Sequence, residues 1–245
     1  MTLVIFICII VFVYMSLLSP IKKRQEEITV QNFELNVTNQ HQVIDEFIAK
    51  MIGETKSLSS RSTIREALLQ YKNQKINWNE LYQVTYPRYQ DGIHVLDHYI
   101  YVARWVDDQI LVSFGDTHEI QTTEIAYSEA LTVHYDHDRQ NLIIQNPITE
   151  EDHVLGYDIL CVSMIPILEK IDARGYDVWI QPNKDENTLI HDHDVVTVVK
   201  AFDNFEGTFY AQIEEDALFG DARDVQYRIF AYSASLISSS VFTDL

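Results

Sequence analysis

The sequence predicts an α+β protein in which a long N-terminal helix packs on an antiparallel sheet, and three observations support this fold class. Residues 31–58 contain no proline and one glycine, and their apolar residues recur at helical spacing. After Gly92 the apolar period changes to that of strands, and the strands come in pairs separated by short polar turns. Strands that follow a helical layer and are joined by hairpins form antiparallel sheets, because only parallel strands need long crossover connections.

Three helices are expected ahead of the strands. The first covers residues 31–58. Capping-box patterns at residues 63–66 and 77–80 predict the starts of the second and third helices, because a Thr or Asn followed three residues later by Glu satisfies two free backbone N–H groups. The third helix should end before Pro87, since proline cannot continue the hydrogen-bond ladder.

The strands follow in hairpin order, with Asp107 and Asp108 at the first turn. Pro166 should open a short helix that ends near Gly175. Residues 176–222 hold further short strands, which form either a second small sheet or an extension of the first. The main expected strands are residues 99–106, 110–114, 131–135, 142–144 and 154–164.

The charge and the glycine content of the chain exclude several classes of function. The 245 residues include 18 Lys and Arg against 37 Asp and Glu, a net charge of −19, whereas nucleic-acid binding needs clustered Lys and Arg. The seven glycines lie at least thirteen positions apart. Phosphate-binding loops, dinucleotide-binding turns and the nucleophile elbow of hydrolases need glycines about two to five positions apart. We therefore expect no nucleic-acid partner, no cofactor and no enzymatic activity.

An apolar segment at the N-terminus predicts a membrane anchor. Residues 3–18 contain no charged side chain, and a membrane span needs about 20 apolar residues. A cleaved signal peptide is the alternative, but a basic start and the small residues of a cleavage site are missing. Lys22, Lys23 and Arg24 follow this segment, and the positive-inside rule would place them in the cytoplasm, which conflicts with export of the rest of the chain.

These observations divide the chain into four parts. Residues 1–21 are the expected uncleaved anchor, and residues 22–175 hold the helical layer and the main sheet. Residues 176–222 form the second small β subdomain or the sheet extension. Residues 223–245 are expected to be helical, and this helix either ends the domain or begins a second membrane segment.

The combination resembles the extracytoplasmic Cache sensor region, which is PAS-like, of bacterial transmembrane receptors such as sensor histidine kinases and diguanylate cyclases. The resemblance covers about residues 30–222 and rests on the pattern Leu-x-x-Arg-x-x-Ile-Arg-x-x-Leu-x-x-Tyr in residues 58–71, on the hairpins, and on the stretches 146–149 and 153–158. The sequence departs from this family in two ways. We do not find in it the arginine–tryptophan–aspartate set by which some Cache domains hold amino acids, and we find no output domain.

The resemblance implies a small-ligand sensor of a two-component or related signal-transduction receptor. It further implies anchorage in the inner membrane through the N-terminal helix, with about residues 22–222 in the periplasm. Pairing of the long helix with a second copy would give a homodimer. Helices that shift when the ligand binds would relay its presence.

Aromatic residues of the first hairpin are the predicted ligand contacts. Strand alternation places Tyr99, Tyr101 and Trp105 on one face and Arg104 on the other. A PAS-like sheet binds ligands in mostly apolar pockets with a few polar groups, and Asp158 on the central strand is the predicted polar contact. The alternative interpretation is that these aromatic residues are ordinary sheet core.

The string from His191 to Asp194 raises the question of a metal site. In an extended strand His191 and His193 would share one face, where two imidazoles can bind one metal. His134, His137 and Asp138 could add further ligands. An acidic surface produces such strings by chance, so we predict no metal site and retain His191 and His193 as the candidates. Two other functions stay open: an envelope-anchored metal-dependent hydrolase that uses the His and Asp clusters, and an acidic envelope protein that binds a partner.

Overall fold

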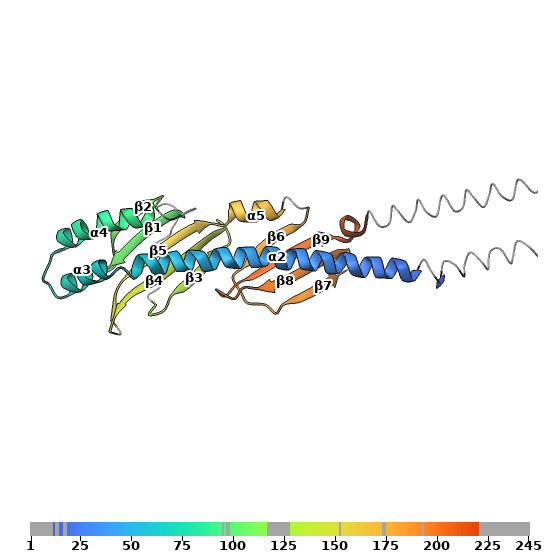
Figure 1. Cartoon of the computed structure of the whole chain (residues 1–245), viewed down its shortest axis with the longest axis horizontal. Helices are drawn as coiled ribbons and strands as arrows, with labels where there is room; N and C mark the ends of the chain where they lie inside the picture. Colours follow the sequence, from blue (N-terminus) through green and yellow to red (C-terminus); the bar gives the residue numbers. More distant parts are fainter. Residues whose placement is uncertain are drawn as a thin grey trace, which may run out of the picture.

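Two antiparallel sheets lie one after the other along a single long helix, α2 (Ser19–Ser59), in the computed structural model of the chain (Figure 1). The structure describes residues 12, 15, 16, 19–94, 96, 99–116, 128–151, 153–172, 175–192 and 194–220. Nearly all of the predicted anchor, and the predicted helix at residues 223–245, lie outside the described residues. In the described ranges, no helix combines the length and the apolar character that crossing a membrane requires.

Helix α2 holds the two sheets together through one buried stripe. The buried positions include Phe33, Val37, Ile44, Ile48 and Met51, whose spacings of three, four and seven residues keep them on one face of a helix. They join residues from both sheets in a single hydrophobic cluster. The predicted long helix is thus confirmed, and it begins twelve residues earlier than the sequence pattern indicated.

The capping box predicted for the third helix is confirmed, and the one predicted for the second helix is wrong. At the start of α4 (Trp78–Ile93), the Asn77 side chain accepts a bond from the Glu80 N–H at 3.0 Å, and the Glu80 carboxylate accepts one from the Asn77 N–H at 2.8 Å. Helix α3 (Ser62–Lys72) instead begins after Arg61 without any side-chain cap.

The end predicted for the third helix is also wrong, because α4 continues through Pro87. A proline within a helix removes one backbone hydrogen bond and destabilises an isolated helix. Here Leu81, Thr85 and Tyr89 recur every four residues and are all buried, so packing holds the helix on both sides of the proline.

The first sheet, which we call sheet A, confirms the predicted hairpins. Its strand order is β2-β1-β5-β4-β3, with the central strand β5 between the two hairpins. The turn residues Asp107 and Asp108 both have positive φ, 48° and 61°, as in the tight turns that match the twist of a hairpin. The strands are β1 (Tyr99–Val106), β2 (Gln109–Gly115), β3 (Thr132–Asp136), β4 (Asn141–Glu150) and β5 (His153–Ser163).

The second sheet, sheet B, shares no paired strand with sheet A among the described residues. Helix α5 (Ile165–Asp172) leads into it, and its strand order is β6-β9-β8-β7. It packs on the N-terminal half of α2, whereas sheet A packs on the C-terminal half next to α3 and α4 (Figure 1). The strands are β6 (Asp177–Gln181), β7 (Thr188–Asp192), β8 (Val195–Ala201) and β9 (Thr208–Glu214).

Candidate functional site

Sheet A has two different faces. Val102 belongs to the cluster that includes the buried stripe of α2, so the face that carries it is the inner face. Tyr101, Ala103 and Trp105 alternate with it and form a second cluster with residues of β4 and β5, among them Ile143 and Cys161. We call this second surface the outer face. Two of the predicted ligand contacts, Tyr101 and Trp105, therefore lie together on the outer face, as the sequence predicts.

The Trp105 end of the outer face carries a second aromatic residue that sequence reasoning missed. Tyr157 on β5 is directly opposite Trp105 on β1, and opposite residues of an antiparallel pair point to the same side. The signal was available, since Tyr157 lies next to the proposed polar contact in the central strand. Burial is the main cause that raises the pKa of Tyr157, and the Glu129 and Asp108 carboxylates raise it further.

The Trp105 indole and the Tyr101 hydroxyl interact on this face. Trp105 Nε1 is buried, and Tyr101 is 2% exposed. Burial raises the pKa of the Tyr101 hydroxyl, and the hydrogen bond from Trp105 opposes this rise.

Tyr99 does not lie with Tyr101 and Trp105, contrary to the strand alternation predicted for it. The pairing of β1 with β5 shifts register between Tyr99 and Tyr101, and such an irregularity interrupts the two-residue period. Tyr99 packs against the cluster that contains the buried stripe of α2. Its placement on the inner side separates it from the other two aromatic residues.

Asp158 also faces α2, so it provides no polar group to the outer face. Its two carboxylate oxygens accept hydrogen bonds from Arg104 Nε at 2.7 Å and Arg104 Nη2 at 2.6 Å. The Ser59 hydroxyl, in the last turn of α2, donates a further bond of 2.7 Å to Asp158 Oδ2. The sequence predicted that Arg104 points away from Tyr101, but it did not predict that Asp158 is its partner.

The Arg104–Asp158 pair is a buried junction between sheet A and the end of α2. Both side chains are completely buried, and Arg104 Nη2 also donates to the Leu58 carbonyl of α2 at 3.0 Å. The guanidinium lies 4.9 Å from the centre of the Tyr89 ring in α4. Burial alone would lower the pKa of Arg104, but the charge and hydrogen bonds of Asp158 outweigh it and raise this pKa. Two strands and two helices therefore meet at one ion pair.

Arg61 joins α3 to α4. Its Nη1 donates to the carbonyl of Arg88 in α4 at 2.7 Å, which ties the start of α3 to α4.

The described residues contain no cluster of three or more His, Cys, Asp or Glu side chains that could hold a metal ion. His191 lies on β7 with half of its side chain exposed, and its Nε2 is 3.4 Å from a carboxylate oxygen of Glu215. His193 lies outside the described residues. The described part of the chain thus offers no support for the metal-dependent hydrolase.

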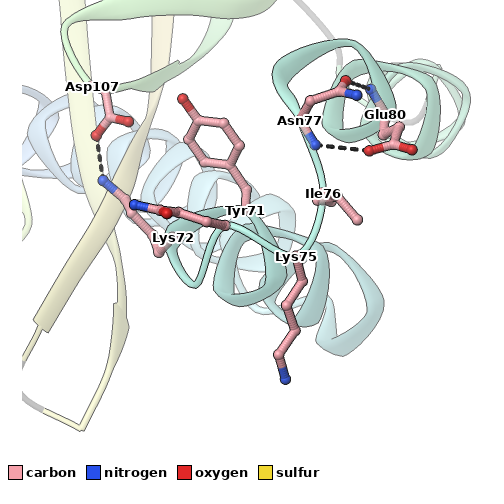
Figure 2. Close-up of a pocket in the computed structure, with 8 residues that line it drawn as sticks. Tyr71, Lys72, Lys75, Ile76, Asn77, Glu80 and Asp107 are labelled. Atoms are coloured by element: carbon pink, nitrogen blue, oxygen red, sulfur yellow. Dashed lines mark hydrogen bonds and ion pairs between the residues drawn. The ribbon is translucent and has the colours of Figure 1, made fainter.

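A polar hollow of about 580 Å³ lies at the end of the molecule formed by the α3–α4 turn and the β1–β2 turn (Figure 2). Its polar groups bond mainly to one another: the Lys72 ammonium pairs with Asp107, and Asn77 and Glu80 form the capping box. Tyr71 projects between these two groups (Figure 2). The hollow is lined by none of the four predicted ligand contacts, and its charged groups are largely neutralised in place.

Comparisons with known proteins find similarity to solved structures only, and this similarity shows the fold alone. No family model matches the sequence, and no curated protein matches it. Among solved structures, the sensor domain of the V. cholerae histidine kinase DctB has a TM-score of 0.54 at 8% identity, covering 78% of this chain and 98% of that one. A domain of a putative sensory box/GGDEF family protein from Vibrio parahaemolyticus has a TM-score of 0.52 at 9% identity, with coverages of 79% and 98%.

The ligand-binding domain of Mlp24, solved with asparagine, is similar to the same degree. Its TM-score is 0.51 at 11% identity, and the match covers 81% of this chain and 98% of that one. The similarity thus extends over both sheets and the long helix, and it includes sensor domains of different receptor classes. The chain has the α+β fold of Cache-type extracytoplasmic sensor domains.

Proposed function

We propose that this chain is the extracytoplasmic small-ligand sensor module of a bacterial transmembrane signal-transduction receptor. The observation that carries this proposal is the match of nearly the whole length of several sensor domains to one continuous fold in this chain. The neighbours are sensor domains, and one of them was solved with a bound amino acid. A fold alone does not determine function, so the proposal also depends on the site.

The outer face of sheet A is the proposed ligand site. It carries aromatic side chains together with one indole N–H and one tyrosine hydroxyl, the combination of apolar surface and few polar groups that small-molecule sites have. The inner side of the same strands carries the Arg104–Asp158 junction with α2. A ligand that moves β1 or β5 would therefore move the end of the long helix as well.

A metabolite screen by thermal unfolding tests this proposal. A ligand that binds only the folded state stabilises it, by about 2.7 kcal/mol when its concentration is 100 times the dissociation constant. We expect at least one small metabolite to raise the unfolding temperature of the full chain, and Trp105→Leu to abolish this rise. If no metabolite stabilises the chain, or if stabilisation survives loss of Trp105, the proposed function or the proposed site is wrong.

Anchorage in the inner membrane through residues 1–21, with residues 22–222 in the periplasm, belongs to the same proposal. Its support is the apolar sequence at residues 3–18 and one further structural neighbour, which is the extracellular domain of a putative histidine kinase. A reporter that is active only in the periplasm, fused after residue 222, would test this orientation. If only a cytoplasmic reporter is active at the same position, residues 22–222 lie in the cytoplasm, as Lys22–Arg24 suggest under the positive-inside rule.

A homodimer formed along α2 completes the proposal. Ile21, Ile28, Leu35 and Val43 are 47–59% exposed and lie at intervals of seven, seven and eight residues, close to the heptad period of a coiled coil. They lie opposite the stripe that packs on the sheets. We expect Leu35→Glu to dissociate the dimer, measured by sedimentation equilibrium of the full chain, while Ile190→Glu on sheet B leaves it intact. Equal dissociation by both variants would place the interface elsewhere.

A further inference from the structure

Strand β7 leaves one edge of sheet B open. It is the outermost strand of that sheet, and β8 is its only neighbour among the described strands (Figure 1). All five of its residues, Thr188–Asp192, are exposed. Alternate residues of an antiparallel strand direct their backbone N–H and C=O groups to opposite sides, so about half of these groups in β7 point away from β8. Such a row of backbone groups is a template on which another extended chain can pair.

The features that usually prevent such pairing are missing from β7. Natural edge strands are protected by Lys, by Pro, by bulges or by a covering element. Strand β7 contains no Lys or Pro and pairs with β8 without a register shift. Two of its residues are instead apolar, and Leu189 is 39% exposed and Ile190 45% exposed. The opposite edge strand, β6, contacts α5 and is partly buried, so β7 is the open edge of sheet B.

Hydrogen bonds at both ends hold β7 in its extended form. Before the strand, the Asn187 side chain accepts a hydrogen bond of 2.7 Å from the Ala201 N–H. After the strand, the Asp194 carbonyl accepts one of 2.6 Å from the Glu215 N–H. A strand that is already ordered loses little conformational entropy when another chain pairs with it. The open edge is therefore arranged for binding before a partner arrives.

The charge around β7 determines the chemistry of the partner. Residues 185–216 contain nine Asp and Glu against one Lys or Arg, Lys200, which pairs with Glu34. Asp192 lies in β7 itself, and a carboxylate oxygen of Glu215 lies 3.4 Å from Nε2 of His191. Carboxylates attract a basic chain to this edge and repel an acidic one.

We infer that β7 is the docking edge for an extended, Lys- or Arg-rich segment of a partner protein, which pairs with β7 as a fifth strand of sheet B. In this mode of recognition the backbone hydrogen bonds supply affinity and the side chains supply specificity. Leu189 and Ile190 point to opposite faces, so the added strand covers apolar surface on both sides of the sheet. The surface is separate from the proposed ligand site on sheet A, and the inference can fail while the sensor function stands.

Three labelled peptides separate backbone pairing from charge. The peptide (Lys-Val)4 offers both, its fully N-methylated form keeps the charge but donates no backbone hydrogen bond, and (Glu-Val)4 reverses the charge. We expect (Lys-Val)4 to bind the full chain at least about 10-fold more tightly than either of the others in fluorescence anisotropy, because several backbone hydrogen bonds each add to the affinity. Equal binding of the N-methylated peptide or of (Glu-Val)4, or no binding of (Lys-Val)4, would overturn the inference.

A matched pair of variants connects binding to the edge of sheet B. Ile190→Lys should weaken the binding of (Lys-Val)4 by about 10-fold, because it removes apolar surface and adds the charge that protects natural edge strands. Ile110→Lys is the control, since Ile110 is 41% exposed on β2, an edge strand of sheet A. It should leave binding unchanged. Both side chains are exposed, so neither substitution disturbs the core, and equal weakening by the two variants would contradict docking at β7.

A second pair of variants tests the role of the carboxylates. The double variant Asp192→Asn/Asp194→Asn should weaken the binding of (Lys-Val)4 by about 3-fold, the range of exposed charge pairs. Asp108→Asn/Asp138→Asn removes the same charge from the turns of sheet A and should have almost no effect. If the two double variants weaken binding equally, the peptide responds only to the net charge of the chain, and the inference is wrong.

Hydrogen–deuterium exchange locates the bound peptide. Backbone amides of residues 188–192 should exchange more slowly in the presence of (Lys-Val)4, because those on the open side become hydrogen-bonded. Protection elsewhere without protection of β7 would overturn the inference. Sedimentation equilibrium without peptide tests a second copy of the chain as the occupant of this edge. Dissociation of an oligomer by Ile190→Lys would show that β7 pairs with a second copy instead of a basic partner.

Discussion

Sheets A and B contact the same helix, but the two sets of contacts are of different kinds. Sheet A is joined to the end of α2 by the completely buried Arg104–Asp158 pair, which also reaches the backbone of the helix. Sheet B packs on α2 through apolar residues and through polar contacts nearer the surface, such as Lys200 with Glu34 at 3.2 Å. Between β8 and β9, the Asn204 amide also donates to Asp45 of α2 at 2.8 Å.

The difference indicates separate tasks for the two sheets. A buried ion pair allows few alternative arrangements, because separating its members leaves charges without partners in a medium that solvates them poorly. The junction in sheet A therefore suits the transfer of a displacement from the strands to α2. Contacts at the surface are weaker and more easily exchanged, so sheet B is better suited to follow the helix than to displace it.

The largest expected effect comes from breaking the junction in sheet A. We expect Arg104→Met to lower the free energy of unfolding by about 3–5 kcal/mol, because it leaves the Asp158 carboxylate buried without its partner. Urea denaturation followed by far-UV circular dichroism measures this loss. The double variant Arg104→Met/Asp158→Leu should recover most of the stability, since no buried charge remains. A double variant as unstable as the single one would show that packing, and not charge, dominates this junction.

A smaller effect is expected from the corresponding pair at sheet B. The Lys200 side chain is 17% exposed and that of Glu34 is 40% exposed, so solvent screens their attraction. Lys200→Met should therefore change the free energy of unfolding by less than about 1 kcal/mol in the same measurement. A loss as large as that of Arg104→Met would contradict the distinction between the two sheets.

The smallest expected effect concerns His41, where α2 meets sheet B, and it depends on pH. The His41 ring is stacked on Phe202 with centroids 4.8 Å apart. Burial lowers the pKa of His41 below 6.5, and this outweighs the opposing effect of the Asp45 and Asp203 carboxylates. The unfolded chain therefore takes up a proton at a higher pH than the folded chain, so stability falls as the pH drops below about 6.5.

The comparison of two histidine variants measures this effect. Between about pH 7.5 and about pH 5.5, His41→Gln should lose less stability than the unsubstituted chain, because it removes the proton uptake of one buried imidazole. His134→Gln on the exposed side of β3 is the control and should show the full pH dependence. Identical pH dependence in all three proteins would mean that His41 titrates normally.

The parts of the fold that depend on local pattern could be predicted from the sequence. The hairpins of sheet A follow from apolar alternation interrupted by polar turns, and the cap at Asn77 follows from its Glu three residues later. Features that depend on packing could not be predicted in this way. Helix α4 runs through Pro87 because buried neighbours hold it, and Tyr99 faces α2 because the register shifts beside it.

The same distinction between local pattern and packing applies to the candidate site. Alternation was sufficient to place Tyr101 and Trp105 on one face, whereas the same rule gave no reason to pair Arg104 with Asp158, fifty-four residues away. Strand β7 was not predicted either. All five of its residues are exposed, so no buried face imposes the alternation of apolar residues that marks a strand in a sequence. Contacts between distant segments are set by which strands become neighbours, and that information is not local.

The sequence by itself determined the fold class of this protein, because its periodicity predicted a long helix followed by antiparallel strands. Only the tertiary structure decided which face of sheet A packs on α2 and holds the Arg104–Asp158 ion pair. The physical reason is that periodicity fixes the direction of a side chain within its own strand. What that side chain meets depends on strand order and register, which the whole chain sets together.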